Sequence, residues 1–171
     1  NYLSTVDGVF VEIGSERGEG STEYFARLAS EKNTRLITVD VVPISNQING
    51  VEYVTATGSK WAREIFPGYN EKISCLYLDN FDWDWHPENT EDFVIEQQNR
   101  YADLGFRMSN LNSQRAHLAQ MAAAMPAMAP SSIVVCDDTW YNKWWGHYSG
   151  KGGAVVPFLL NHGYEVLYTE E

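Results

Sequence analysis

The segment from Val9 to Asp40 places the strongest constraint on how this chain can fold. An apolar run predicted as a strand, Val9–Ile13, leads into a glycine-rich turn, a helical pattern and a second apolar run that reaches Asp40. Glycines permit turn conformations and allow a ligand to approach the backbone closely, and the helix start presents unpaired N–H groups. An acid about twenty residues beyond the last glycine can accept hydrogen bonds from ribose hydroxyls. The pattern therefore predicts a site for an adenosine-bearing cofactor.

Carboxylates around the turn restrict the kind of cofactor. Glu12 lies on the first strand, and Glu16 and Glu19 lie within the turn itself. Helix N-termini favour anions, but three acids at the same place would repel a pyrophosphate. They suit a ligand with positive charge, such as S-adenosylmethionine, and Glu12 is placed to attract its ammonium and sulfonium groups. The alternative interpretation is a glycine turn that serves only strand–helix packing.

The run Glu12-Ile13-Gly14-Ser15-Glu16-Arg17-Gly18-Glu19-Gly20 resembles the first motif of the class I S-adenosylmethionine-dependent methyltransferases. This resemblance implies that the cofactor lies along the turn, with Asp40 at the ribose and the short helix from Ser59 beside the adenine. The cofactor-binding residues expected on this basis are Glu12, Gly14, Ser15, Gly18, Gly20, Ser21, Asp40, Val41, Gly58, Ser59 and Asp79.

Length and charge narrow the class of protein further. A chain of 171 residues is sufficient for one sizeable core, which predicts a single domain over residues 1–171. The net charge of −11 argues against nucleic-acid and anionic-membrane partners. The sequence contains neither a run of apolar residues long enough to span a membrane nor a signal peptide. Cys75 and Cys136 are expected to lie too far apart for a disulfide, which favours a cytoplasmic protein.

Strand and helix patterns alternate along the chain, which predicts an α/β, doubly wound, mostly parallel Rossmann-like sheet with helices on both faces. Ser21 or Thr22 is expected to cap the first helix. The predicted strands are Val9–Ile13, Leu36–Val41, Val51–Ala56, Ile73–Leu78, Ile133–Cys136 and Tyr164–Tyr168. The predicted helices are Thr22–Lys32, Trp61–Phe66, Gln114–Met125 and Ala154–Asn161.

Two features depart from the usual methyltransferase plan. No segment of this sequence is expected to form the seventh strand that normally closes the sheet, so this strand is absent, supplied by a missing segment or replaced. The connection after the fourth strand, residues 80–112, is much longer than a crossover needs, and long connections in compact domains are often functional. We expect residues 80–112 to form a substrate lid, with a plain surface excursion as the alternative.

Acidic residues follow two of the predicted strands. Asp79 ends one strand, and Asp137 and Asp138 end the next. Neighbouring carboxylates raise one another's pKa unless a cation joins them, and Mg²⁺ binds oxygen ligands of this kind. The set resembles the metal-dependent O-methyltransferases of the catechol and macrolide-sugar kind, and Ser149–Val155 also resembles their entry to the next helix. The resemblance implies Mg²⁺ at Asp79, Asp137 and Asp138 and methyl transfer to a hydroxyl.

The general base is less well defined, because catechol-type enzymes carry a basic residue where this chain has Asp82. Either Asp82 itself or a histidine is expected to remove the proton. His147 is the preferred candidate, since it follows the acidic pair within an aromatic segment. His117 is expected to pack on its helix, and His86 to lie in a turn.

The aromatic segment Trp140–Trp145 is too rich in large rings for an ordinary solvated turn. It is expected to stack on a phenol or sugar substrate, while a contact in a homo-oligomer and a cover for the missing strand are alternatives. The function expected from these features is O-methylation of a small molecule or sugar. Aminopropyl transfer, a sugar-modifying or hydroxylase-like relative and a non-catalytic S-adenosylmethionine-binding module remain open.

Overall fold

The computed structural model describes residues 7–15, 18, 20–84 and 92–169. The chain divides into two compact units. The first comprises Asn1–Asn80 and Ala119–Asp137, and the second comprises Phe81–Leu118 and Asp138–Glu171. The expectation of one domain with a substrate lid at residues 80–112 stays a prediction.

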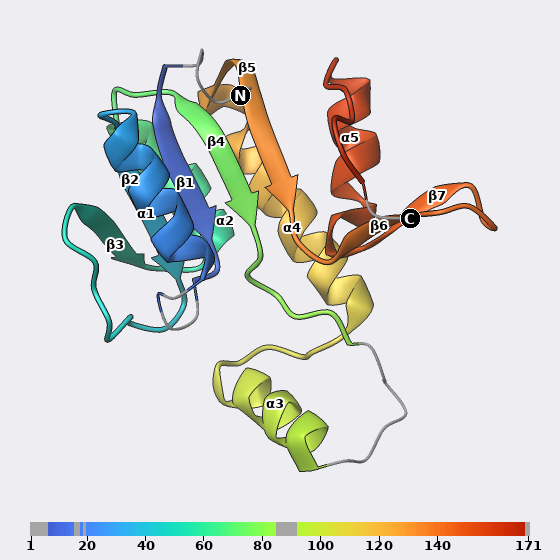
Figure 1. The fold of residues 1–171 in the computed structure, drawn as a ribbon. Coiled ribbons are helices and arrows are strands. Elements are labelled where there is room, and N and C mark those ends of the chain that lie inside the picture. Colours follow the sequence, from blue (N-terminus) through green and yellow to red (C-terminus); the bar gives the residue numbers. More distant parts are fainter. Residues whose placement is uncertain (1–6, 16–17, 19, 85–91, 170–171) are drawn as a thin grey trace. The chain divides into compact units, whose positions relative to one another are not determined.

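The first unit contains a five-stranded sheet in the order β3-β2-β1-β4-β5 (Figure 1). All neighbouring strands are parallel, which confirms the predicted α/β, Rossmann-like class. Strand order reverses between β1 and β4, so the carboxyl ends of these two strands mark the switch point where ligands bind in such sheets. The strands are β1 (Val9–Ile13), β2 (Leu36–Asp40), β3 (Val51–Thr55), β4 (Ile73–Leu78) and β5 (Met128–Cys136).

Helices cover both faces of this sheet, as predicted. Helix α1 (Ser21–Glu31) lies in front of the sheet in Figure 1, and α2 (Gly58–Lys60) lies behind it. The chain continues from α2 into a π-helical turn, η2 (Trp61–Ile65), and a 3₁₀ turn, η3 (Phe66–Gly68). Helix α4 (Asn110–Ala124) belongs to the first unit only from residue 119, and the 3₁₀ turn η4 (Met125–Ala127) follows it.

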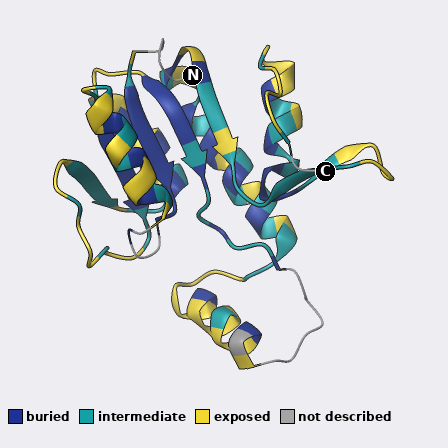
Figure 2. Ribbon diagram, viewed as in Figure 1, coloured by how far each residue is buried: buried dark blue, intermediate teal, exposed yellow. Residues whose placement is uncertain are grey.

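The central strands are buried on both faces, as Figure 2 shows in dark blue for β1 and β4. Residues on the α1 side form a core cluster that includes Phe10, Phe25, Leu36 and Cys75. Parallel strands covered on both faces are nearly continuously apolar. The sequence pattern of these strands therefore predicted their burial as well as their type.

The second unit contains α3 (Asp92–Asp103), the first part of α4, and a hairpin of β6 (Thr139–Asn142) and β7 (His147–Gly150). A 3₁₀ turn, η5 (Lys151–Gly153), and helix α5 (Val155–Asn161) follow the hairpin. The aromatic segment therefore forms part of an antiparallel hairpin. The predicted strand Tyr164–Tyr168 is wrong, because residues 164–169 form no strand in the structure and Leu167 and Tyr168 are exposed. In the part of the chain that the structure describes, no helix combines the length and apolarity needed to cross a bilayer.

Candidate functional site

The turn after β1 passes directly over the chain that leaves β4. Gly14 has a φ of +96°, and a Cβ atom there would lie 2.4 Å from the Cα of Asn80. The Gly14 N–H donates to the carbonyl of Val39 at 2.9 Å. Only glycine allows this approach, so the first glycine of the motif brings the turn to the switch point.

Asp40 lies beside this turn at the end of β2. Its Oδ2 accepts a hydrogen bond from the Ser15 N–H at 3.0 Å, and its Oδ1 accepts one from the Val42 N–H at 2.9 Å. A carboxylate offers about four acceptor positions, and the two amides fix its orientation. The structure thus brings Asp40, Gly14 and Ser15 together, as the sequence predicted.

Glu12 is fully buried beneath the turn. Its Oε1 accepts from the Ser21 hydroxyl at 2.7 Å, and its Oε2 accepts from the hydroxyls of Thr22 and Thr38 at 2.7 and 2.8 Å. Burial raises the pKa of Glu12, although the three hydrogen bonds oppose this shift. The carboxylate therefore joins α1 to β2, and both its oxygens are engaged by protein hydroxyls.

The start of α1 differs from the prediction in consequence. The N-cap residue is Gly20, with no side-chain cap hydrogen bond, because Ser21 and Thr22 direct their hydroxyls to Glu12. The capping prediction is wrong for this reason. Glu16 and Glu19, which the sequence places in the turn, lie outside the described residues, whereas Gly18 is described and has a φ of +76°.

The segment that follows β3, the parallel neighbour of β2, also lies at this edge of the sheet. A Cβ at Gly58 would lie 2.4 Å from Cγ2 of Ile13 and 3.0 Å from Cδ of Gln120. Thr57 caps α2 by accepting from the Lys60 N–H at 3.3 Å. The predicted cofactor residues Val41 and Ser59 are half-buried.

The acids after β4 and β5 do not form the predicted metal site. Leu78 pairs with Cys136, so Asp79 and Asp137 are level, as expected. The Tyr77 hydroxyl donates to Asp79 at 3.2 Å, and burial, followed by the charges of Asp79 and Asp137, raises the pKa of Tyr77.

Asp138 belongs to the second unit, where the buried ammonium of Lys151 lies 3.0 Å from its Oδ2. Among the described residues, no group of three His, Cys, Asp or Glu side chains is placed to hold a metal ion. The prediction of Mg²⁺ at Asp79, Asp137 and Asp138 is wrong, because the charge of Asp138 is already balanced by Lys151.

The two candidate bases both lie in the second unit. The Asp82 carboxylate accepts from the Gln97 amide at 2.7 Å, and its backbone N–H donates to the Tyr101 hydroxyl at 2.7 Å, so α3 holds Asp82 in place. His147 begins β7 and is exposed. Their catalytic roles stay predictions. His117 is buried with Nδ1 2.7 Å from the Ser113 carbonyl one turn earlier, as expected for a packed helix residue, and His86 lies outside the described residues.

Sequence reasoning missed several buried polar atoms near the switch point. Within the described parts of the chain, Ser15 Oγ, Gln120 Oε1 and Trp61 Nε1 are buried without a hydrogen-bond partner. The Gln120 Nε2 donates to the Asn80 side-chain carbonyl at 2.9 Å. The available signal was a single glutamine in the Ala- and Met-rich end of α4, where apolar residues would be expected.

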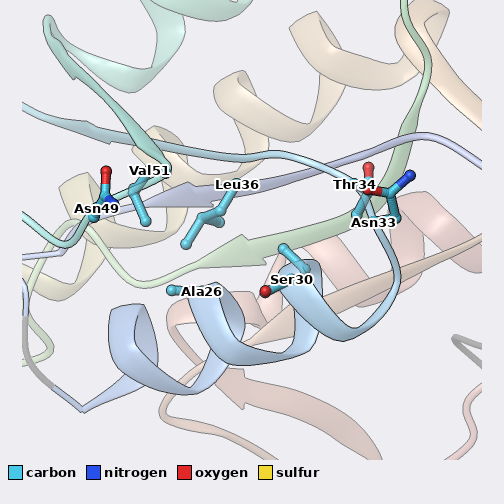
Figure 3. Close-up of a pocket in the computed structure, with 9 residues that line it drawn as sticks. Ala26, Ser30, Asn33, Thr34, Leu36, Asn49 and Val51 are labelled. Carbon is cyan, nitrogen blue, oxygen red and sulfur yellow. The ribbon is translucent and has the colours of Figure 1, made fainter.

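Two cavities of the first unit lie at the opposite edge of the sheet. One of about 230 Å³ lies between α1 and the starts of β2 and β3, where Ala26 and Ser30 face Leu36 and Val51 (Figure 3). The other, of about 540 Å³, is lined by Asn70–Lys72 before β4 and by Pro126 and Ala127 before β5. Ligands of parallel α/β sheets bind beyond the carboxyl ends of the strands, so neither cavity is the candidate site.

No protein-family model and no curated protein matches this chain. Among solved structures, the chain is similar to a ligand-free aldohexose dehydrogenase of Thermoplasma acidophilum, with 11% identity and a TM-score of 0.51 over 91% of this chain. It spans 58% of the length of that dehydrogenase. An enzyme of Bordetella bronchiseptica, WbmG, in complex with NAD matches 77% of this chain and 53% of its own, with 7% identity and a TM-score of 0.38. The dehydrogenase likeness shows the shared fold.

The dehydrogenase likeness corrects the functional prediction. The solved structure that shares this fold is a dehydrogenase rather than a methyltransferase, which contradicts the predictions of an O-methyltransferase and of S-adenosylmethionine as cofactor. The prediction of Mg²⁺ is contradicted as well, because the described residues hold no metal-binding group. Contrary to the sequence prediction, the charge of Glu12 does not face a ligand, because the carboxylate is buried and accepts hydrogen bonds from three hydroxyls.

Proposed function

We propose that the first unit binds an adenine dinucleotide, NAD, and that the protein is an oxidoreductase. The observation that carries the proposal is the position of Asp40, whose carboxylate is fixed beside the glycine turn by the Ser15 N–H at 3.0 Å. An acid at the end of the second strand hydrogen-bonds ribose hydroxyls in this fold. The solved structure that shares the fold is a dehydrogenase, which supports the oxidoreductase class.

The residues around the turn fit such a ligand. Gly20 has a φ of +60°, and a Cβ there would meet no atom within 4 Å, so this position leaves room above the start of α1. Helix α1 has 11 residues, and the N–H groups at its start favour a phosphate. The Glu12 carboxylate is buried, and both its oxygens accept hydrogen bonds from protein hydroxyls rather than from a ligand.

In this proposal, NAD supplies hydride transfer and the protein supplies binding and orientation. Asp40 would hold the adenosine ribose, and the described glycines Gly14, Gly18 and Gly20 would lie beneath the pyrophosphate. The substrate is proposed as a small molecule with a hydroxyl or carbonyl carbon that exchanges the hydride.

Calorimetric titration of the protein with NAD and NADP tests the proposal. An acid at Asp40 accepts from a free 2′-hydroxyl and repels a 2′-phosphate, so NAD should bind at least about tenfold more tightly. NADH fluorescence in the presence of a panel of sugars and small alcohols then tests for turnover. Absence of binding to both dinucleotides would refute the cofactor assignment, and binding without turnover would indicate a cofactor-binding module.

A further inference from the structure

Gln120 carries a buried acceptor that nothing in the described chain satisfies. Its side chain is only 2% exposed, and its Nε2 donates to the Asn80 side-chain carbonyl at 2.9 Å. Its Oε1 has no hydrogen-bond partner among the residues that the structure describes. A buried acceptor without a donor is unfavourable and rare in folded proteins. The arrangement is explained if a bound ligand or an ordered water supplies the missing donor.

The location of Gln120 favours a ligand. Asn80, which orients the amide, follows β4 and lies directly under Gly14 at the switch point. On the other side, Gly58 allows the amide to approach, since a Cβ there would lie 3.0 Å from the Gln120 Cδ and 3.1 Å from its Nε2. The amide thus lies between the glycine turn after β1 and the start of α2, within the edge proposed to hold the cofactor.

The neighbouring strands indicate which part of the cofactor lies there. Asp40, the proposed ribose ligand, pairs with Thr55 across β2 and β3. Gly58 follows three residues after Thr55, so a base attached to that ribose can lie against the start of α2. The exocyclic amino group of adenine is a donor that fits an unpaired amide oxygen.

We infer that Gln120 is a specificity-determining residue that accepts a hydrogen bond from the 6-amino group of adenine, with Asn80 as the residue that positions it. This inference rests on the proposed binding of NAD. It adds that the protein distinguishes adenine from hypoxanthine, which carries a carbonyl oxygen in place of the amino group. Two facing acceptors repel each other and leave both unsatisfied.

The test compares NAD with nicotinamide hypoxanthine dinucleotide, in which a carbonyl oxygen replaces the 6-amino group and N1 carries a hydrogen. The wild-type protein should bind NAD about tenfold more tightly, or better, in calorimetric titrations. Gln120→Met removes the acceptor at similar volume and should bring the ratio of the two dissociation constants close to one. Gln114→Met is the matched control on the same helix, since Gln114 belongs to the second unit and donates to the Gly150 carbonyl, and it should keep the wild-type ratio.

The ratio of the two affinities is measured within one protein, so a lower folded fraction of Gln120→Met changes both constants equally. Equal affinities of the wild type for the two dinucleotides would overturn the inference and leave NAD binding intact, as expected if a water satisfies Gln120. Preference for the hypoxanthine dinucleotide, or an unchanged ratio in Gln120→Met, would also overturn it. Failure of the wild type to bind either ligand would refute the proposed function and the inference together.

Discussion

The backbone N–H of Ser15 donates to Oδ2 of Asp40 at 3.0 Å, across 25 positions of sequence. The contact follows from the sheet, because β1 and β2 are parallel neighbours with Ile13 opposite Val39. The residues that follow each strand therefore meet at the carboxyl edge. A short backbone turn and one acid thus define the part of the edge at which we place the cofactor ribose.

Asp40→Ala is expected to weaken NAD binding by about 1–3 kcal/mol, the loss for charge-assisted hydrogen bonds to the ribose. Asp40→Asn keeps one acceptor oxygen and should give a smaller loss. Calorimetric titration measures both, and thermal unfolding of each variant without ligand shows whether the turn is preserved. An affinity for NAD unchanged in Asp40→Ala would place the ribose elsewhere.

Gly14→Ala should destabilise the protein far more than Gly20→Ala. Both positions have positive φ, which costs a non-glycine residue about 1–2 kcal/mol. At Gly14 the added Cβ would also lie 2.4 Å from the Asn80 Cα, whereas at Gly20 it would meet no atom within 4 Å. Urea denaturation of the two variants measures the difference. Equal losses of unfolding free energy would show that the turn does not approach β4 as closely as the structure indicates.

The sheet could be predicted from the sequence because its signals are local. Apolar runs of strand length alternate with helical patterns, and the strands from Val9 and Ile73 are found with the predicted ends at Ile13 and Leu78. Tyr164–Tyr168 is a similar run of strand length, but it forms no strand in the structure. A strand needs a partner with free backbone groups, and residue patterns do not reveal whether one is available.

The chemistry of the site could be predicted only where the backbone determines it. Asp40 and Gly14 meet because parallel strands end at one edge. Whether an acidic side chain is already hydrogen-bonded or neutralised depends instead on side chains distant in sequence. Thr38 is 26 positions from Glu12 and completes its hydrogen bonds, and Lys151 neutralises Asp138 after an intervening hairpin. Neither partner is visible in the local sequence of the acid, which is why the local pattern predicts ligand or metal contacts for both.

Glu12 should make the stability of the protein fall as pH rises. Burial raises its pKa in the folded state above the ordinary value of 4.5. The folded state therefore holds the proton more tightly than the unfolded state does, and the resulting stabilisation is complete below pH 4.5 and is lost as pH rises through the folded-state pKa. Glu12→Gln lacks this titration and should gain stability relative to the wild type over that range.

Urea denaturation of the wild type and of Glu12→Gln between about pH 4 and about pH 8 measures the difference between their unfolding free energies. Glu12→Ala is the companion variant. This substitution removes the acceptor for Ser21, Thr22 and Thr38. It should lower the unfolding free energy by about 2–5 kcal/mol across this pH range. A gap between wild type and Glu12→Gln that is constant with pH would contradict the raised pKa.

Asp138→Ala should lower the free energy of unfolding more than Lys151→Met does. The Lys151 side chain is 4% exposed and that of Asp138 is 35% exposed. Loss of the acid leaves a buried ammonium without this partner, which costs about 3–5 kcal/mol, while a partly exposed carboxylate retains water. The double variant should be less destabilised than the sum of the single variants, with a coupling of about 1–3 kcal/mol in urea denaturation. Additive losses would show that the pair does not interact in solution.

The hairpin tryptophans are expected to contribute little to stability, in contrast to Trp61. Trp144 and Trp145 are 96% and 75% exposed, whereas Trp61 is fully buried against Phe66, with ring centroids 4.9 Å apart. Trp144→Ala and Trp145→Ala should each change the unfolding free energy by less than about 0.5 kcal/mol and remove the most red-shifted part of the tryptophan emission. Trp61→Ala should cost about 3–5 kcal/mol. A large loss of stability in either hairpin variant would mean that these rings are covered in solution, by a second copy of the chain or by another partner.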